Sequence, residues 1–348
     1  MIVLIATHCQ KLIHNSTSRR NIHMSDSIID SLKNKVIEGN LITKEEAKEL
    51  LSAPIDELCA AANEIREHFC GNGFDLCSIT NAKCGKCSED CKFCAQSAHY
   101  DTEVTYYSLK SGDEMTEEAV HNENQGILRF SLVTSGRSLS PKEIDSVCDS
   151  IREIKSKSMI EICVSIGITD VDSFRKLIDA GATRVHCNLE TSARFFPSIC
   201  STHTYEDKIG TLKAARAAGL SICSGGIMGI GETENDRIDM AFTLRDLGVK
   251  SVPVNFLSPI KGTPLEHNRS LCDNDKRRII AIYRFILPDA AIRLAGGRGL
   301  IADKGEGCFR AGANAAISGD MLTTSGITAA TDIALIRSLG FVPKLSGQ

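Results

Sequence analysis

Three cysteines stand close together in the stretch CSEDCKFCAQ. They are Cys87, Cys91 and Cys94, spaced C-x3-C-x2-C. A structural zinc site takes four protein ligands, and a catalytic zinc site usually includes a histidine or a carboxylate. A four-iron cluster held by three thiolates leaves one iron open to a ligand from outside the protein. The spacing therefore predicts an iron–sulfur cluster with one free position, and Cys84, the nearest other thiol, is expected to take no part.

The composition limits the class of protein. The chain has 348 residues, 42% of them hydrophobic and 24% charged, as in ordinary globular proteins. Fifteen cysteines are an odd number, which excludes a fully paired disulfide framework and favours a reducing, cytoplasmic location. A net charge of -4 with scattered Lys and Arg argues against nucleic acid as a partner. No apolar run approaches the roughly 18 to 20 residues that a membrane span needs.

Two segments precede the main domain. Residues 1–23 contain no acidic residue and several Ser, Thr, Arg and His, so we expect either a disordered leader or an organellar transit peptide. Met24 is an alternative start. Residues 24–76 are predicted to be a helical segment, because TKEE from Thr43 is a capping box and apolar residues then recur at helical spacing.

Short β-branched runs and amphipathic helices alternate through residues 77–330. This alternation predicts a parallel sheet, and about eight repeats predict a TIM-type (β/α)8 barrel, with its chemistry at the carboxyl ends of the strands. Residues 331–348 are predicted to be a C-terminal helix and tail. The expected strands lie within 77–80, 127–135, 159–167, 183–191, 220–230, 251–259, 291–297 and 314–319.

The cysteine motif, with Phe93 before its last cysteine, resembles that of the radical S-adenosylmethionine enzymes. The resemblance implies that Cys87, Cys91 and Cys94 hold a [4Fe-4S] cluster whose open iron binds S-adenosylmethionine. A second run, CSGGIMGIGET, resembles the glycine-rich strand that contacts this cofactor in the family, and glycine lets a ligand approach the backbone closely. The glycines of this run are Gly225, Gly226, Gly229 and Gly231.

Five stretches, the glycine-rich run among them, resemble the branch of this family that inserts sulfur into dethiobiotin. They are HCNLETS, CSGGIMGIGE, SVPVNFLSPIKGTPLE, IRLAGGR and FRAGANAAISGDMLTT, in that order. The resemblance implies a sulfurtransferase in which reductive cleavage of S-adenosylmethionine gives a radical that abstracts hydrogen from the substrate. An auxiliary iron–sulfur cluster is then the sulfur donor.

The resemblance also assigns polar residues to ligands. Glu190 and Lys208 are expected to contact S-adenosylmethionine, with Lys208 meeting its methionyl carboxylate. Asn188 and Asn255 are expected to contact dethiobiotin. A capping or turn role remains the alternative for Asn188, Glu190 and Asn255, and an exposed helix face remains the alternative for Lys208.

The auxiliary cluster is where the sequence departs from the family pattern. That pattern holds a [2Fe-2S] cluster with three cysteines and an arginine, and Cys163, Cys223 and Arg293 match three of these positions. The fourth position is Ser131, whose oxygen is a poorer ligand for iron–sulfur clusters than a thiolate.

Three explanations remain open for this departure. Ser131 ligates weakly, another group such as Cys187 or Cys200 replaces it, or the cluster is of a different type. Strand alternation counts against Cys187, whose parity is opposite to that of Asn188 and Glu190. We expect the other thiols to be inert: Cys9, Cys59, Cys70, Cys77, Cys148, Cys272 and Cys308.

The resemblance further implies an electron donor such as flavodoxin or ferredoxin, and a homodimer. Two other functions fit the cysteine motif: a sister barrel enzyme that acts on another small substrate, and a non-catalytic iron–sulfur redox sensor. The sister enzyme has no need of Cys163, Cys223 and Arg293 on three strands. A sensor has no need of an S-adenosylmethionine pocket.

Overall fold

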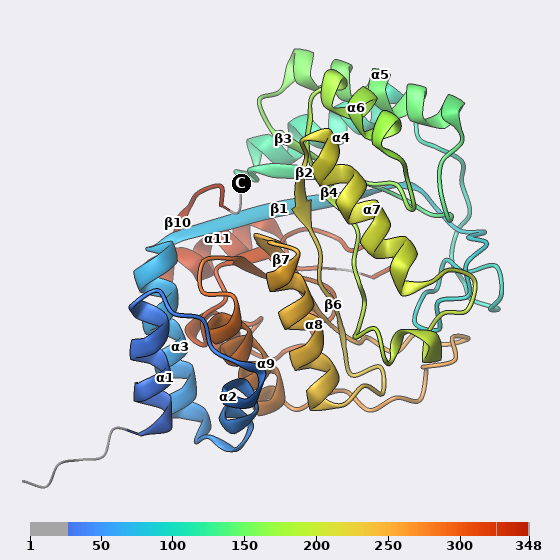
Figure 1. Ribbon diagram of the computed structural model, residues 1–348. Helices are drawn as coiled ribbons and strands as arrows, with labels where there is room; N and C mark the ends of the chain where they lie inside the picture. The colour runs from blue at the N-terminus through green and yellow to red at the C-terminus, as the bar shows by residue number, and fades with distance from the viewer. Residues whose placement is uncertain (1–26, 325, 347–348) are drawn as a thin grey trace, which may run out of the picture.

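The computed structural model describes residues 27–324 and 326–346, and it confirms the predicted TIM-type barrel (Figure 1). Eight parallel strands form a sheet that closes on itself, because β1 pairs with β2 on one edge and with β9 on the other. The predicted leader at 1–23 lies outside the described residues. The barrel strands are β1 (Gly73–Lys83), β2 (Arg129–Thr134), β3 (Glu161–Ser165), β4 (Ala182–His186), β5 (Ser221–Cys223), β7 (Ser251–Phe256), β8 (Ala291–Leu294) and β9 (Ala315–Ile317).

Helices connect the strands and cover the outside of the barrel (Figure 1). Their ends follow local sequence signals. The side chain of Ser140 accepts a hydrogen bond from the backbone of Glu143 at the start of α5. Gly181 and Gly219 end α6 and α7 with φ of 116° and 106°, a conformation that suits glycine. The helices are α4 (Gly112–Asn124), α5 (Pro141–Lys157), α6 (Val171–Ala180), α7 (Tyr205–Ala218), α8 (Glu234–Asp246), α9 (Asp273–Ile286), α10 (Glu306–Arg310) and α11 (Ala329–Ser338).

From residue 27 on, where the described part of the chain begins, three α-helices precede the barrel: α1 (Ile28–Ile37), α2 (Lys44–Glu49) and α3 (Ile55–Cys70). They lie together on one side of the barrel, where α3 packs on α9 and α2 on α8 (Figure 1). The capping box at Thr43 forms as predicted. No helix within the described ranges has the length and apolar character that a membrane crossing requires.

The structure differs from the predicted elements at three places. β1 begins at Gly73, so the strand before the cysteine motif is longer than expected. The run at 220–230 forms two short strands, β5 and β6 (Gly226–Met228), and β6 pairs with β7. The C-terminal tail adds β10 (Val342–Pro343), which pairs with the start of β1.

Alternation along β4 and the residues after it separates two environments. Val185, Cys187 and Leu189 are buried in the apolar core. Arg184, on the opposite face, makes a 4.0 Å ion pair with Asp75. Neighbouring side chains on a strand point to opposite faces, so the inward face carries the polar residues. Cys187 thus shares the parity of the apolar residues Val185 and Leu189, and its orientation away from the barrel interior stays a prediction from strand alternation.

A buried ion pair ties the C-terminal helix to the barrel. The two terminal guanidinium nitrogens of Arg298, Nη1 and Nη2, each lie 2.6 Å from an oxygen of the Asp332 carboxylate in α11, and the two side chains are 2% and 1% exposed. Arg298 also donates to the Ile317 carbonyl at the end of β9. This one side chain thus links the loop after β8, strand β9 and helix α11.

We expect Arg298→Met to lower the free energy of unfolding by about 3–5 kcal/mol, because it leaves a buried carboxylate without its countercharge. Urea denaturation of the cluster-free protein measures this loss. Arg152→Ala is the matched control, since its pair with Asp149 is exposed and contributes at most about 0.5 kcal/mol. Equal loss in both variants would contradict the importance of burial.

Candidate functional site

The three-cysteine motif lies in the loop after β1. Cys87, Cys91 and Cys94 are free thiols and half-buried. The backbone of Cys87 donates to the Gln96 carbonyl at 2.9 Å, and the Cys94 N–H donates to the Cys91 carbonyl at 2.9 Å. These bonds fold the motif into a compact turn at the carboxyl end of β1, where barrel enzymes carry their chemistry. The donor set fits a cluster that is held by three thiolates.

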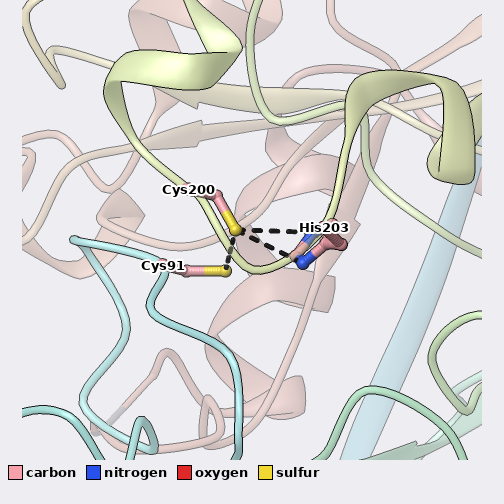
Figure 2. A group of neighbouring side chains, drawn as sticks. All are labelled: Cys91, Cys200 and His203. Carbon is pink, nitrogen blue, oxygen red and sulfur yellow. Dashed lines mark hydrogen bonds between the residues drawn. The ribbon is translucent and has the colours of Figure 1, made fainter.

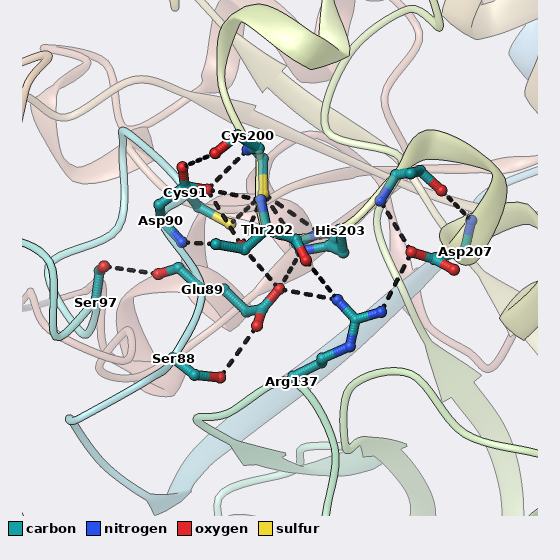
Figure 3. A network of polar contacts seen from close by, with 12 residues as sticks. Ser88, Glu89, Asp90, Cys91, Ser97, Arg137, Cys200, Thr202, His203 and Asp207 are labelled. Atoms are coloured by element: carbon teal, nitrogen blue, oxygen red, sulfur yellow. Dashed lines mark hydrogen bonds and ion pairs between the residues drawn. The ribbon is translucent and has the colours of Figure 1, made fainter.

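A second loop, residues 199–203, forms hydrogen bonds with the motif, as Figure 3 shows. Asp90 accepts a hydrogen bond from the backbone of Ser201 at 2.8 Å, and Lys92 donates to the Ile199 carbonyl at 2.9 Å. The Cys200 Sγ lies 3.8 Å from the Cys91 Sγ (Figure 2). The structure thus places Cys200 with the first cysteine motif, although the sequence left it open as an auxiliary ligand.

Only one of these two neighbouring thiols ionises easily. Its hydrogen bond with Cys91, supported by His203, lowers the pKa of Cys200 to about 4 although burial opposes this change. The same hydrogen bond, together with burial, raises the pKa of Cys91.

Glu190 and Lys208 lie near the cysteine motif. Burial raises the pKa of the Glu190 carboxyl, and Lys208 partly offsets this effect. Burial opposes protonation of Lys208, but Cys187, Glu190 and Cys91 nearby outweigh it and raise its pKa. The Glu190 Oε2 atom is buried and has no hydrogen-bond partner among the described residues. A buried oxygen without a partner is costly unless a ligand satisfies it, so Glu190 fits a site for a cationic group such as an amine.

The glycine-rich run packs closely against the backbone of neighbouring segments, at Pro253 and Glu190. A Cβ on Gly225 would lie 1.9 Å from the Pro253 carbonyl oxygen, and a Cβ on Gly226 would lie 2.3 Å from the Glu190 carbonyl oxygen. Both positions therefore require glycine for strand packing, before any ligand is considered. Gly229 and Gly231 have φ of 97° and 105°, so the turn after β6 needs their conformational freedom.

Asn188 and Asn255 hold this strand end in place. The Asn188 Oδ1 accepts a hydrogen bond from the Gly225 N–H at 3.0 Å. The Asn255 amide donates to the Gly226 carbonyl at 3.1 Å and accepts from the Gly296 N–H at 2.9 Å. Both amides have further bonding capacity that a ligand can use. The backbone contacts show that each also has a structural role.

Three buried thiols and one arginine meet inside the barrel. The Arg293 Nη1 lies 3.1 Å from the Cys77 Sγ. Burial raises the pKa of Cys77 and of Cys163, and the nearby Cys223 thiol raises both pKa values further. Burial also opposes ionisation of Cys223, but a 3.5 Å contact with the His186 Nδ1 and the nearby guanidinium groups outweigh it and lower its pKa to about 7. The group therefore holds one thiol that ionises near neutral pH.

Cys77 was missed because it lies in no cysteine-rich motif. It lies on β1, two residues before Ile79, which is the register partner of Ser131 on β2. Ser131 itself pairs with Cys163 on β3. Cys187 belongs to the apolar core. A signal was present in the sequence, since alternation along β1 puts Cys77 on the same face as Asp75, an acidic residue in an otherwise apolar run.

The charges around these thiols favour an anion. Arg129, Arg184 and Arg293 are at most 2% exposed, and Asp75 is the fully buried carboxylate beside them. Glu161, at the rim, lies 3.9 Å from Arg129. Three guanidinium groups against two carboxylates leave a positive excess, and the Nε and Nη2 atoms of Arg129 have no hydrogen-bond partner in the described part of the chain. An iron–sulfur cluster with thiolate ligands carries the negative charge and acceptor sulfurs that would fit.

Comparison with known families shows which family the chain belongs to. Residues 83–244 match the radical SAM superfamily, and residues 253–342 match the biotin and thiamin synthesis associated domain. The chain is 56% identical to biotin synthase from Brachyspira hyodysenteriae, over 90% of this chain and 94% of that protein. It is 54% identical to biotin synthase 2 from Corynebacterium diphtheriae, over 91% and 96%.

Solved structures agree on the fold. The structure is similar to that of methylornithine synthase, with a TM-score of 0.78 and 21% identity over 90% of this chain and 97% of the other. It is equally similar to a maturase of the [FeFe]-hydrogenase, with a TM-score of 0.78 and 18% identity over 91% and 75%. Identities this low show the shared barrel alone, whereas the sequence relatives show the family. The chain therefore belongs to the biotin synthase family of the radical SAM superfamily.

Proposed function

We propose which residues of this chain bind the cofactor, the substrate and the sulfur-donating cluster in its reaction. That reaction is the insertion of sulfur into dethiobiotin to form biotin. The observation that carries the proposal is the group of Cys77, Cys163 and Cys223 inside the barrel, with Arg293 beside Cys77 and Cys223. A sister radical enzyme has no need of three buried thiols beside a guanidinium. A redox sensor has no need of the buried carboxylate of Glu190 beside the cysteine motif.

The first site binds S-adenosylmethionine and its cluster. Cys87, Cys91 and Cys94 would hold the [4Fe-4S] cluster, which when bound supplies the electron that cleaves S-adenosylmethionine. The unsatisfied Glu190 carboxylate would bind the methionyl amine, and Lys208 would bind the methionyl carboxylate. Phe93 packs against the core beside the motif, and the strand end from Gly225 to Gly231 would lie against the cofactor.

The substrate contacts come from the same strand ends. Asn188 and Asn255 each leave part of their amide unused, and the ureido ring of dethiobiotin offers matching donors and acceptors. Both amides are fixed by backbone hydrogen bonds. Their orientation would therefore be set before the substrate arrives, which lowers the cost of ordering it.

The second site would hold the auxiliary cluster that donates sulfur. Its ligands would be Cys77, Cys163 and Cys223, with Arg293 beside them and Ser131 no longer required. Ser131 on strand β2 stands where the family pattern has its third cysteine. In the proposed set, Cys77 on strand β1 would supply that third thiolate instead. The changed geometry supports a cluster that differs from the [2Fe-2S] type. Cys187 and Cys200 have no place in this set.

The electron donor and the homodimer are predicted from the family resemblance alone. An electron donor such as flavodoxin or ferredoxin would reduce the first cluster, and the chain would form a homodimer. Fourteen free thiols among the described residues are compatible with a reducing location such as the cytoplasm.

We expect Cys77→Ser to lose the iron of the auxiliary cluster and to keep the [4Fe-4S] cluster. Serine is a poorer ligand for iron–sulfur clusters than a thiolate. Because position 131 is already a serine, the variant keeps only two cysteines, Cys163 and Cys223, at this site. Iron and sulfide analysis with Mössbauer spectra measures both clusters in the reconstituted protein. Biotin formation should fall to background, while cleavage of S-adenosylmethionine continues.

Cys187→Ser and Ser131→Ala are the controls for this test. Cys187→Ser changes a buried thiol outside the proposed ligand set. Ser131→Ala removes the hydroxyl at the position where the family pattern has a cysteine ligand. Both should keep the auxiliary iron. An unchanged auxiliary spectrum in Cys77→Ser, or its loss in Ser131→Ala, would contradict the proposed ligand set.

Glu190→Gln should weaken binding of S-adenosylmethionine by about tenfold or more, because a hydrogen bond to a charged group contributes about 1.5–3 kcal/mol. The formation of 5′-deoxyadenosine, measured against cofactor concentration with and without dethiobiotin, gives this change. Glu117→Gln, on the exposed face of α4, is the matched control. Equal concentration dependence in both variants would remove Glu190 from the cofactor site.

A further inference from the structure

A group of metal-binding atoms lies beside the first cysteine motif and is not explained by the family reaction. The Cys91, Cys200 and His203 side chains offer two sulfurs and a ring nitrogen, all within 4.8 Å of one another (Figure 2). Cys91 belongs to the motif, whereas Cys200 and His203 come from the loop between β4 and α7. The [4Fe-4S] cluster needs Cys91 but neither of the other two.

The distances match those around one metal ion. The two sulfurs are 3.8 Å apart, and the Cys200 Sγ lies 3.3 Å from the His203 Nδ1 and 3.8 Å from the His203 Nε2. Two thiolates bound at about 2.3 Å to one tetrahedral zinc ion lie about 3.8 Å apart, and a thiolate and an imidazole nitrogen lie slightly closer. Ligands of a cubane cluster sit on different irons. The spacing of Cys91 and Cys200 therefore fits a single ion better than two corners of a cluster.

The surroundings orient the histidine as a ligand. The Glu89 Oε2 accepts a hydrogen bond from the His203 Nδ1 at 2.5 Å, so the proton lies on Nδ1 and the lone pair of Nε2 is available to a metal. A carboxylate that holds the other ring nitrogen is the usual support of a metal-binding histidine. Glu89 is itself fixed by Thr202 at 2.9 Å and by Arg137 at 3.5 Å (Figure 3).

Burial makes the arrangement specific. Glu89, Cys200 and His203 are between 4% and 7% exposed, whereas Cys91, which belongs to the motif, is half-buried. A buried histidine and carboxylate pair needs a function or a full set of partners. Two thiolates and an imidazole select zinc or iron(II) over magnesium or calcium, which prefer oxygen ligands.

We propose that Cys91, Cys200 and His203 form a site for one zinc or iron(II) ion in the protein that lacks its [4Fe-4S] cluster. The fourth position is open to water or to a neighbouring cysteine of the motif. Because Cys91 is shared, a metal ion in this site and the cluster exclude each other. A bound iron(II) ion would occupy the motif before cluster assembly, and a bound zinc ion would delay that assembly.

Cobalt(II) titration of the cluster-free, reduced full chain tests the site, because cobalt bound by thiolates absorbs visible light. Wild-type protein should show one more tightly bound cobalt ion than Cys200→Ser. His203→Gln should weaken that ion by about ten- to a hundredfold. Cys148→Ser, a buried thiol in α5, is the matched control and should bind as the wild type does.

A second measurement separates a lost ligand from a damaged fold. Zinc added before iron and sulfide should slow [4Fe-4S] reconstitution in the wild type and in Cys148→Ser, but much less in Cys200→Ser and Cys200→Ala. Both Cys200 variants should rebuild the cluster fully without zinc, which also shows that they fold. Equal cobalt binding in Cys200→Ser and wild type, or equal zinc inhibition in all four proteins, would overturn the proposal.

Discussion

The Asp75 carboxylate and the Arg293 guanidinium form the buried ion pair on which the interior of this barrel depends. Their closest atoms are 3.1 Å apart, and both side chains are almost inaccessible to solvent. The same guanidinium donates to the Ala316 carbonyl at 3.1 Å and contacts the Cys77 sulfur. Buried charges need partners, so Asp75 fixes the direction of Arg293 and therefore its approach to the thiols. Arg129, Arg184 and Arg293 outnumber the carboxylates of Asp75 and Glu161, and this positive excess favours an anionic group in the barrel.

Strand alternation decides which cysteines can reach that group. Thiols on the inward faces of β1, β3 and β5 meet polar side chains, whereas Cys187 lies among apolar core residues, with Lys208 and Glu190 as its charged neighbours. The first cysteine motif is governed differently, because it lies in a loop that a second loop clamps through Asp90. One barrel thus holds two sulfur-rich sites, one built by strand geometry and the other by loop contacts.

Much of this arrangement follows from the sequence. Periodicity and capping residues predict the barrel, and the spacing of Cys87, Cys91 and Cys94 predicts their joint use. Cys77 could not be assigned in this way, because its approach to Arg293 depends on the register between β1, β8 and β9, which no local pattern encodes. Cys200 was equally hidden, since the loop that carries it returns to the cysteine motif after more than a hundred residues.

The most direct test is an anaerobic crystal structure of the reconstituted enzyme, with the irons located by their anomalous scattering. The account predicts two separate iron groups, of which the one inside the barrel lies within bonding distance of the sulfurs of Cys77, Cys163 and Cys223 and next to Arg293. An auxiliary iron bound by the oxygen of Ser131, with the Cys77 sulfur beyond bonding distance, would contradict it.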